Sequence, residues 1–205
     1  MPFWKKTIQN LKESRKYPGV FPLLIAFYFF SDAIVTVTLF AAIYLQVILQ
    51  ASDTLKVILF IVVETGFALG AFFGGLVSDA LGHRKALMGS LALTAVTIVG
   101  LSTIHSSRDG MVIFTLFGLG MGVVYASSRA YLASLIPEEE SGKFFGLYVF
   151  AERCSSIVGP ATWGIVIFLF AGLYPLNYRL AAIAMAILSW LNIKKQQRMV
   201  KKLLP

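Results

Sequence analysis

The sequence predicts an all-α membrane protein, a bundle of six transmembrane helices, and three observations lead to that fold class. Apolar residues make up 58% of the 205-residue chain and charged residues only 14%, whereas soluble domains carry about 25% charged residues. The apolar residues lie in long uninterrupted runs, and roughly 20 such residues cross a bilayer. The runs do not alternate in polarity and are about twice as long as a membrane strand, which argues against a β-barrel.

Six apolar runs follow one another along the chain, separated by short polar connections. The first is too long for the core of a signal peptide, and no small-residue cleavage site follows it. The last is the weakest, because it is short and carries Arg179 near its start. Residues 20–193 are therefore predicted to form one transmembrane domain, without a linker or a second domain. The predicted spans are Val20–Gln46, Leu55–Ser78, Ala86–Ile104, Met111–Ile136, Phe144–Phe170 and Leu176–Ile193.

Cations divide unequally between the two sides that these spans define. Residues 1–19 and 194–205 are both basic, and the second and fourth connections, which share their side, add three more cations. The opposite side has only Lys56, Arg108 and Arg179. Because Lys and Arg are enriched in cytoplasmic segments, both termini are predicted to be cytoplasmic.

The N-terminal segment, residues 1–19, is predicted to be a short amphipathic helix at the level of the lipid headgroups. Phe3 and Trp4 would anchor it there. A disordered basic tail is the alternative. Residues 194–205 are predicted to be a basic cytoplasmic tail.

The composition also excludes several classes of function. The net charge of +8 comes from tails and a turn rather than from a basic helix face with interleaved aromatics, so it fits anionic lipid and not nucleic acid. The single cysteine, Cys154, excludes an intrachain disulfide and a multi-cysteine metal site. No protease, hydrolase or phosphate-binding motif is found. The sequence therefore predicts a protein that is not an enzyme and that holds neither a metal nor a cofactor.

Five ionisable side chains lie inside the predicted spans, where charges are costly and usually functional. Asp32 and Glu64 are placed near the midplane, and Arg129, Glu152 and Arg153 closer to the cytoplasmic side. One of the last two is expected to pair with Arg129 or Glu64. Three acids against two bases leave one carboxylate without a partner, which would suit proton coupling. All five are candidates for a substrate or proton site, although a structural role is as good an interpretation for Asp32 and a slightly better one for Glu64.

Tyr28 and Thr36 join these candidates because they lie one helical turn on either side of Asp32. The three residues recur at a spacing of four, so they form one polar face of the first span. Such a face is expected to line a cavity or to make a helix contact.

Glycines predict where helices pack closely and where one bends. Small-xxx-small steps occur on the second and fourth spans and favour close bundle packing. On the fourth span Arg129 shares a face with the last of these glycines and with Tyr125, so this face is expected to open on a narrow cavity. Gly159 and Pro160, in the middle of the fifth span, predict a kink that is either a gating hinge or a static bend. The packing glycines are Gly66, Gly70, Gly74, Gly118 and Gly122.

The connection between the second and third spans carries a motif. It is so short that the two spans must be antiparallel neighbours. Gly82 can let the chain reverse, and Asp79 can cap or attract the N-terminus of the next helix. Arg84 and Lys85 can pair with Asp79 or with lipid phosphate.

This connection resembles the loop signature of the major facilitator superfamily, a class of secondary transporters. Gly75, Asp79, Gly82 and Arg84 fit the pattern. Ala80 and His83 depart from it, since basic residues are common at both places. A salt-bridge latch of the kind that the resemblance implies would therefore have fewer cations here.

The fourth span and the connection after it narrow the resemblance to one branch. They contain Ser128-Arg129, then Ile136-Pro137, then Phe144-Phe145-Gly146 followed by Tyr148. This stretch is similar to the family of vacuolar amino-acid effluxers and their bacterial relatives, and Asp32 and the segment 155–160 also fit. The similarity covers almost the entire chain, but only the C-terminal half of such a protein.

The resemblance implies one half of a major facilitator fold, with a 3+3 inverted repeat and rocker-type alternating access. The chain would be a half-carrier for a small solute, amino acids being the class to which the family is linked. Its partners would be the lipid bilayer and a second six-helix half or a second copy of itself. The compact loops favour a bacterial inner membrane. The alternative is a non-transporting remnant, or an assembly or regulatory partner of a transporter.

Overall fold

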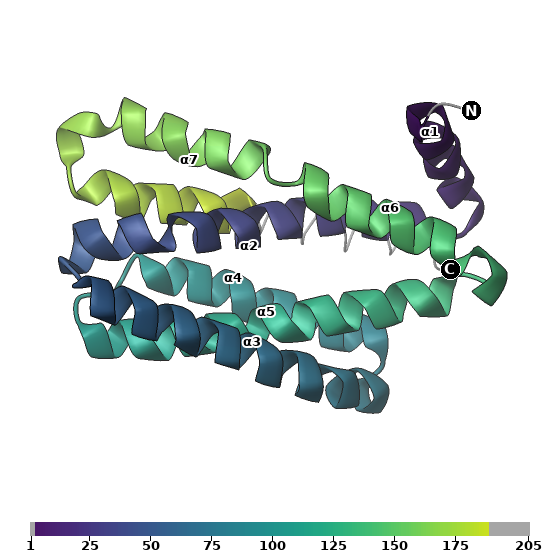
Figure 1. The fold of residues 1–205 in the computed structure, drawn as a ribbon, viewed down its shortest axis with the longest axis horizontal. Helices are drawn as coiled ribbons and strands as arrows, with labels where there is room; N and C mark the ends of the chain where they lie inside the picture. The colour runs from purple at the N-terminus through teal and green to yellow at the C-terminus, as the bar shows by residue number, and fades with distance from the viewer. Residues whose placement is uncertain (1–2, 189–205) are drawn as a thin grey trace.

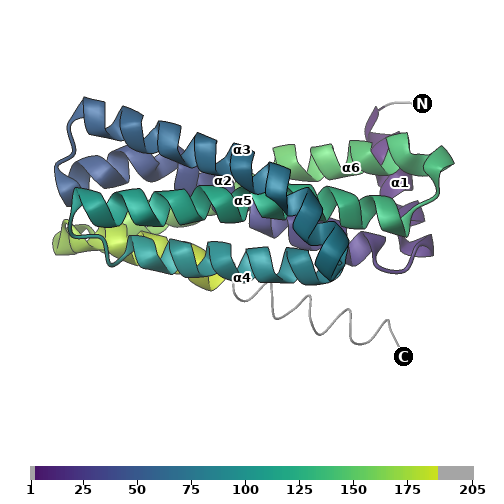
Figure 2. The same ribbon diagram turned by 90° about the horizontal axis from the view of Figure 1, so that it is seen from below.

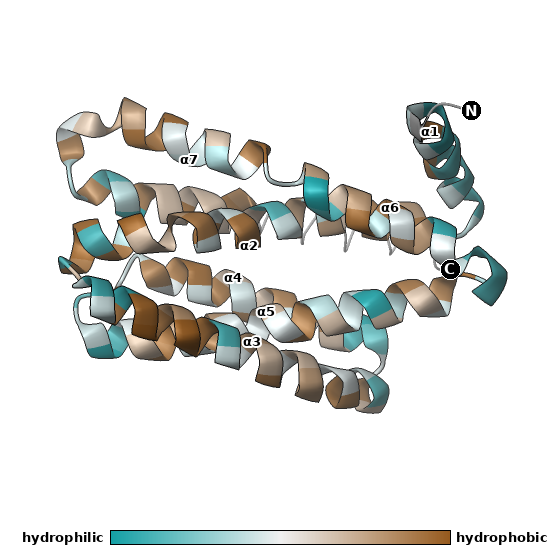
Figure 3. Ribbon diagram, viewed as in Figure 1, coloured by the Kyte–Doolittle hydropathy of each residue, from teal (hydrophilic) through white to brown (hydrophobic). Residues whose placement is uncertain are grey.

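In the computed structural model, which describes residues 3–188, every regular element is a helix (Figure 1). Four of the helices are long and apolar enough to cross a membrane, and they match the first four predicted spans. Figure 3 shows hydrophobic residues along these helices and hydrophilic residues gathered on α1 and at the connections. The long helices are α2 (Val20–Leu49), α3 (Asp53–Leu81), α4 (His83–Leu101) and α5 (Ser107–Leu135).

The predicted fifth span is two helices, α6 (Ser141–Cys154) and α7 (Val158–Leu169), rather than one kinked helix. The break lies at residues 155–157, directly before Gly159 and Pro160. Pro160 falls in the first turn of α7, where its missing N–H removes no helical hydrogen bond. The position of the predicted kink is therefore corrected by a few residues, and its severity is greater than expected.

A helix at Leu176–Leu188 follows and matches most of the sixth predicted span. Residues 189–193 and the basic tail after them lie outside the described residues. Arg179, which weakened this span in the sequence, donates to the carbonyl oxygens of Ser102 and, at 2.7 Å, Ile104. The cation thus satisfies carbonyl groups where the chain leaves α4, which helix geometry alone leaves without donors.

Close packing of α3 against α5 confirms the role predicted for the glycines of these helices. A Cβ on Gly70 would overlap the backbone of Leu119, and one on Gly122 would overlap the carbonyl oxygen of Phe67. A Cβ on Gly74 would lie 2.9 Å from the Cα of Val123. Figure 2 shows α5 lying between α3 and α4. Only glycine lets these two backbones meet.

The loop motif is almost entirely helical. Gly82 is the single residue between α3 and α4, and its φ of 85° confirms that it reverses the chain. No side chain caps α4, so the capping role expected of Asp79 is not present. The side chains of Ser78 and His83 instead join the two helix ends by a 2.8 Å hydrogen bond. Arg84 and Lys85 are exposed beside it.

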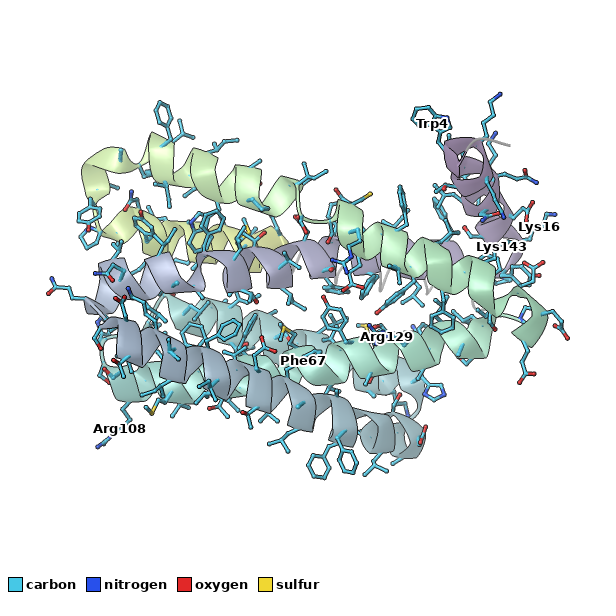
Figure 4. The ribbon with its side chains drawn as sticks, in the orientation of Figure 1. Trp4, Lys16, Phe67, Arg108, Arg129 and Lys143 are labelled. Atoms are coloured by element: carbon cyan, nitrogen blue, oxygen red, sulfur yellow. The ribbon has the colours of Figure 1, made fainter. Side chains whose placement is uncertain are left out.

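Helix α1 (Phe3–Glu13) lies across one end of the bundle (Figure 1). The predicted helical form of the N-terminal segment is thus what the structure has, while its position at lipid headgroups stays a prediction. Figure 4 places Lys16 and Lys143 at this end of the bundle and Arg108 at the other. This is the separation of cations that the predicted orientation requires.

Candidate functional site

A cavity of about 420 Å³ lies between α2, α3, α5 and α6, and we call it the charged cavity. It brings together three of the five predicted intramembrane charges, one from each of three helices: Glu64, Arg129 and Glu152. Its volume lies within the range of about 300–1,000 Å³ that is usual for small-molecule sites. The rest of the lining is mostly apolar: Ile34, Val35, Thr38, Leu39, Phe67, Met121 and Tyr125.

Helical spacing explains how each charge reaches the cavity. On α5, Tyr125 and Arg129 are four residues apart and share a face, as the sequence predicts, and both line the cavity. Gly122, one turn before, turns instead toward the backbone of α3. The close approach that this glycine permits brings Glu64 of α3 near the face that carries Arg129.

The three charges face open space rather than one another. Among the described residues no ion pair joins Glu64, Arg129 or Glu152, so the pairing expected from the sequence is absent. The Arg129 guanidinium lies 6.0 Å from the centre of the Tyr125 ring, at the limit of a cation–π interaction. Glu64 and Arg129 are exposed and Glu152 is partly exposed. The charges are thus available to a bound solute.

Tyrosines hold one wall of the cavity in place. The hydroxyl of Tyr125 is 3.3 Å from that of Ser31, and the hydroxyl of Tyr148 is 2.7 Å from that of Ser128. The Phe27 ring stacks on Tyr148 at 3.8 Å between centroids. Sequence reasoning assigned no role to Ser31, Ser128 or Tyr148. Two of them could have been singled out from the sequence, because Ser128 and Tyr148 belong to the stretch that carries the family resemblance.

Asp32 lies away from the charged cavity, at the break between α6 and α7. It is 3% exposed, and its carboxyl group lies close to the backbone of Ile157 and Gly159 at the start of α7. Its Oδ1 has no partner among the described residues. Thr36 donates to the Asp32 carbonyl oxygen at 2.6 Å. We call these four residues the Asp32 junction.

Gly159 makes the Asp32 junction possible. A Cβ there would overlap the Thr36 hydroxyl and would lie 3.0 Å from Asp32 Oδ2. The start of α7 therefore sits directly on α2, with its N–H groups and positive dipole end toward a carboxylate. The polar face of the first span was expected to line a cavity or to contact a helix, and Asp32 and Thr36 contact a helix.

The remaining candidates are scattered. Tyr28 lines a separate, apolar hollow of about 290 Å³ between α1, α2 and α6. Arg153, in the last turn of α6, is exposed and does not line the charged cavity. Within residues 3–188, no group of His, Cys, Asp and Glu side chains could hold a metal ion.

Comparison with known proteins gives one family and several relatives for this chain. The sequence model of the family described as "Vacuole effluxer Atg22 like" matches residues 2–201. The MFS-type transporter YxiO of Bacillus subtilis (strain 168) is 26% identical over 157 residues, 77% of this chain and 36% of that protein. YttB of the same organism, also named an MFS-type transporter, is 34% identical over 97 residues, 47% of this chain and 24% of that protein.

A fungal protein is also similar to this chain. Autophagy-related protein 22 of Cryptococcus neoformans var. neoformans serotype D (strain JEC21) is 26% identical over 171 residues, 76% of this chain and 30% of that protein. The chain thus spans about a third of the length of the relatives that it matches, or less.

Proposed function

Because the chain belongs to the Atg22-like vacuole effluxer family within the major facilitator superfamily, we propose that it is one half of a secondary transporter. A small solute would bind in the charged cavity and cross the membrane by alternating access. The observation that carries this proposal is the convergence of Glu64, Arg129 and Glu152 on one cavity, without an ion pair among them. Unpaired charge at membrane depth is costly, and a bound solute would offset that cost.

The chemistry of the cavity suits an amino acid. Arg129 can bind a carboxylate through two parallel hydrogen bonds, while Glu64 and Glu152 can accept from an ammonium group. Phe67 and Met121 give the apolar wall that a side chain needs. A zwitterion would therefore meet charges of both signs and leave one acid free, which suits proton coupling.

The flank that α3 forms is where a partner would pack. Only 28% of the most apolar window of α3 is buried, against 61% for α2. Its exposed side chains include Phe60, Phe72 and Phe73. We propose that the chain supplies six helices arranged as a 3+3 inverted repeat, and that a second six-helix half, or a second copy, covers this flank. Transporter sites commonly lie between such halves.

The movement itself would use the break at residues 155–157. Helix α6 carries Glu152 at the charged cavity, while α7 is held to α2 through the Asp32 junction. A break lets α6 tilt without moving α7, so the wall of the cavity can shift while the junction stays closed. Local hinges of this kind absorb backbone rotation during domain movements.

We propose further that both termini are cytoplasmic, in a bacterial inner membrane. The support is the gathering of cations at the α1 end and the two relatives from Bacillus subtilis. A variant with Cys154→Ala and a new cysteine at Lys12 or Arg108 tests the orientation. A membrane-impermeant thiol reagent added to intact cells should label the cysteine at position 108 only, and labelling at position 12 would reverse the orientation.

Transport is tested in proteoliposomes that hold the chain with its partner half. Counterflow of radiolabelled amino acids under a proton gradient should exceed that of empty liposomes. An assembly or regulatory role for the chain is the alternative outcome of this experiment. It would be the correct one if the partner moved the solute equally well without this chain.

A further inference from the structure

Two adjoining hollows lie where α1 crosses the bundle, outside the charged cavity. One, of about 510 Å³, lies between α1 and α6 and is lined by polar and small residues, with Lys6 and Lys143 at its sides. The other is the apolar hollow of about 290 Å³ between α1, α2 and α6. Thr7, Leu147 and Phe150 line both. The two hollows therefore share a wall and form one site that is polar at one end and apolar at the other.

We propose that these hollows bind one anionic phospholipid. Its phosphate would lie between Lys6 and Lys143, and an acyl chain would follow the groove between α2 and α6. This inference does not depend on transport, since it concerns the outer flank of the bundle.

The polar hollow has donors to spare for a phosphate. Lys6 is exposed and makes no hydrogen bond or ion pair with any described residue. Lys143 donates to Glu13 at 2.6 Å and to Glu140, which uses two of the three donors of its ammonium group. These two carboxylates raise the pKa of Lys143 and already balance its charge, so Lys143 offers a phosphate one remaining donor, and Lys6 supplies the unpaired positive charge. Asn10 adds an amide to the same wall.

Glycines keep the floor of the polar hollow open. Gly142 and Gly146 are one turn apart on α6, and a Cβ on either would meet nothing within 4 Å. Larger side chains at these positions would fill the space that a headgroup needs. Because these side chains would not clash with the protein, substitutions at the two glycines can test the polar hollow without disturbing the fold.

The apolar hollow has the shape that an acyl chain needs. Its α6 wall extends from Leu147 to Cys154, about 10 Å at 1.5 Å per residue. Leu24 and Phe29 of α2 form the opposite wall. Such a groove accepts the upper part of a lipid tail and offers little to a polar ligand.

Helix α1 has the two faces that a helix at the headgroup level needs. Trp4, Ile8 and Leu11 form an exposed apolar stripe, with Trp4 71% exposed. Figure 4 shows Trp4 on the side of α1 that faces along the flank of the bundle, and Lys16, which follows α1 in the chain, toward the opposite side. An apolar stripe toward hydrocarbon and cations toward water is the arrangement of an interfacial helix. A helix from a partner protein could cover the apolar hollow, but it would leave Lys6 without an anion.

The test compares lipids with variants of the full chain in detergent. Bound phosphatidylglycerol and phosphatidylcholine with the same acyl chains are counted by native mass spectrometry, and dissociation constants follow from titration. We expect phosphatidylglycerol to bind more tightly. Lys6→Gln should weaken it about fivefold, since a cation at a lipid surface contributes on that order. Lys12→Gln, on the same helix but outside the hollow, should bind as the unaltered chain does.

Gly146→Leu should abolish the preference for phosphatidylglycerol while leaving the helical content and the size-exclusion profile unchanged. Gly164→Leu is the matched control, because a Cβ on this exposed glycine of α7 also meets nothing within 4 Å. Equal binding of both lipids, or an unaffected Gly146→Leu variant, would overturn the proposal. Displacement by inorganic phosphate alone, or by a co-expressed partner half that masks Lys6, would overturn it as well.

Discussion

The charged cavity and the Asp32 junction start from the same sequence feature, an ionisable residue inside an apolar helix, and end in opposite environments. Glu64, Arg129 and Glu152 face about 420 Å³ of open space without an ion pair among them. Asp32 is 3% exposed and sits against the first turn of α7. The two environments therefore differ in the glycine beside the charge and not in the charge itself. Gly159 closes the space around Asp32, and no glycine does so for Arg129.

Electrostatics follows the same division. Two effects oppose each other at Asp32: burial disfavours the charged carboxylate, and the dipole at the start of α7 favours it, by about 0.3–1 kcal/mol in exposed helices. The charges of the cavity have no comparable backbone partner. They are therefore the ones whose free energy a bound solute can change most.

The largest expected effect is a loss of the Asp32 junction through Gly159→Ala. Because the new Cβ would overlap the Thr36 hydroxyl, α7 must move away from α2. We expect the free energy of unfolding to fall by about 3 kcal/mol, which is at the upper end of the range for overpacked cores. Thermal unfolding in detergent measures it.

Gly164→Ala on the same helix is the matched control for this comparison. A Cβ there meets nothing, so the variant should be as stable as the unaltered chain or up to about 1 kcal/mol more stable. If both glycine variants unfold at the same temperature, the junction does not hold α7 in place.

Next in size is the effect of Arg129→Ala on transport. Among the described residues, Arg129 is the one cation that lines the charged cavity, and its loss should lower solute uptake about 100-fold, equivalent to about 2.7 kcal/mol. Arg129→Lys should recover only part of this, since an ammonium group cannot make the paired hydrogen bonds of a guanidinium. Uptake into proteoliposomes is the measurement. Arg153→Ala, exposed and outside the cavity, should stay within about twofold of the unaltered chain, because surface substitutions away from special features have small effects.

The sequence predicted the fold more fully than it predicted the candidate site. Continuous apolar runs predicted the first four long helices, and glycine spacing predicted the contact between α3 and α5, because both depend on local composition. The environment of each charged side chain depends on how its helix is rotated against its neighbours and on the break at residues 155–157. Neither can be read from the sequence of one helix. The sequence therefore placed Asp32 and Glu64 together near the midplane but could not tell that they serve different regions. The expected pairing of Glu152 or Arg153 failed for the same reason.

The roles of the two regions can be separated by variants that remove a charge while keeping the size of the side chain. Asp32→Asn should shift the free energy of unfolding by about 1 kcal/mol, because it removes both the attraction of the carboxylate to the start of α7 and the cost of burying its charge, and it should leave the solute concentration at half-maximal uptake unchanged. Glu64→Gln should do the reverse, raising that concentration about tenfold, as loss of one charged hydrogen bond predicts, with little change in stability. Melting curves and uptake kinetics on both variants are needed together. A similar shift in both quantities for both variants would mean that the two regions act as one site.

The smallest effect concerns charges that are paired and near water, at the contact between α1 and α6. The hydrogen bond from Lys143, with a weaker one from Gln9, lowers the pKa of Glu13 below its usual 4.5. This contribution to stability is complete above the unfolded pKa and is lost as the pH falls through the folded value. The pKa of Lys143 is raised above 10.5, so its contribution is lost only as the pH rises through that higher value. The attachment of α1 should thus hold through the neutral range and loosen at both extremes.

Spin labels at Lys5 and Ser141 would report this attachment as a distance between α1 and α6. The distance should be constant near neutral pH and should broaden only in acid, once the pH has fallen below the usual pKa of a glutamate. The Glu13→Gln variant should show no acid transition, because the group that titrates is gone. Since exposed ion pairs contribute little, the melting temperature should change far less than for Gly159→Ala. An acid transition that persists in Glu13→Gln would assign it to another carboxylate, with Glu140 of the same cluster as the next to replace.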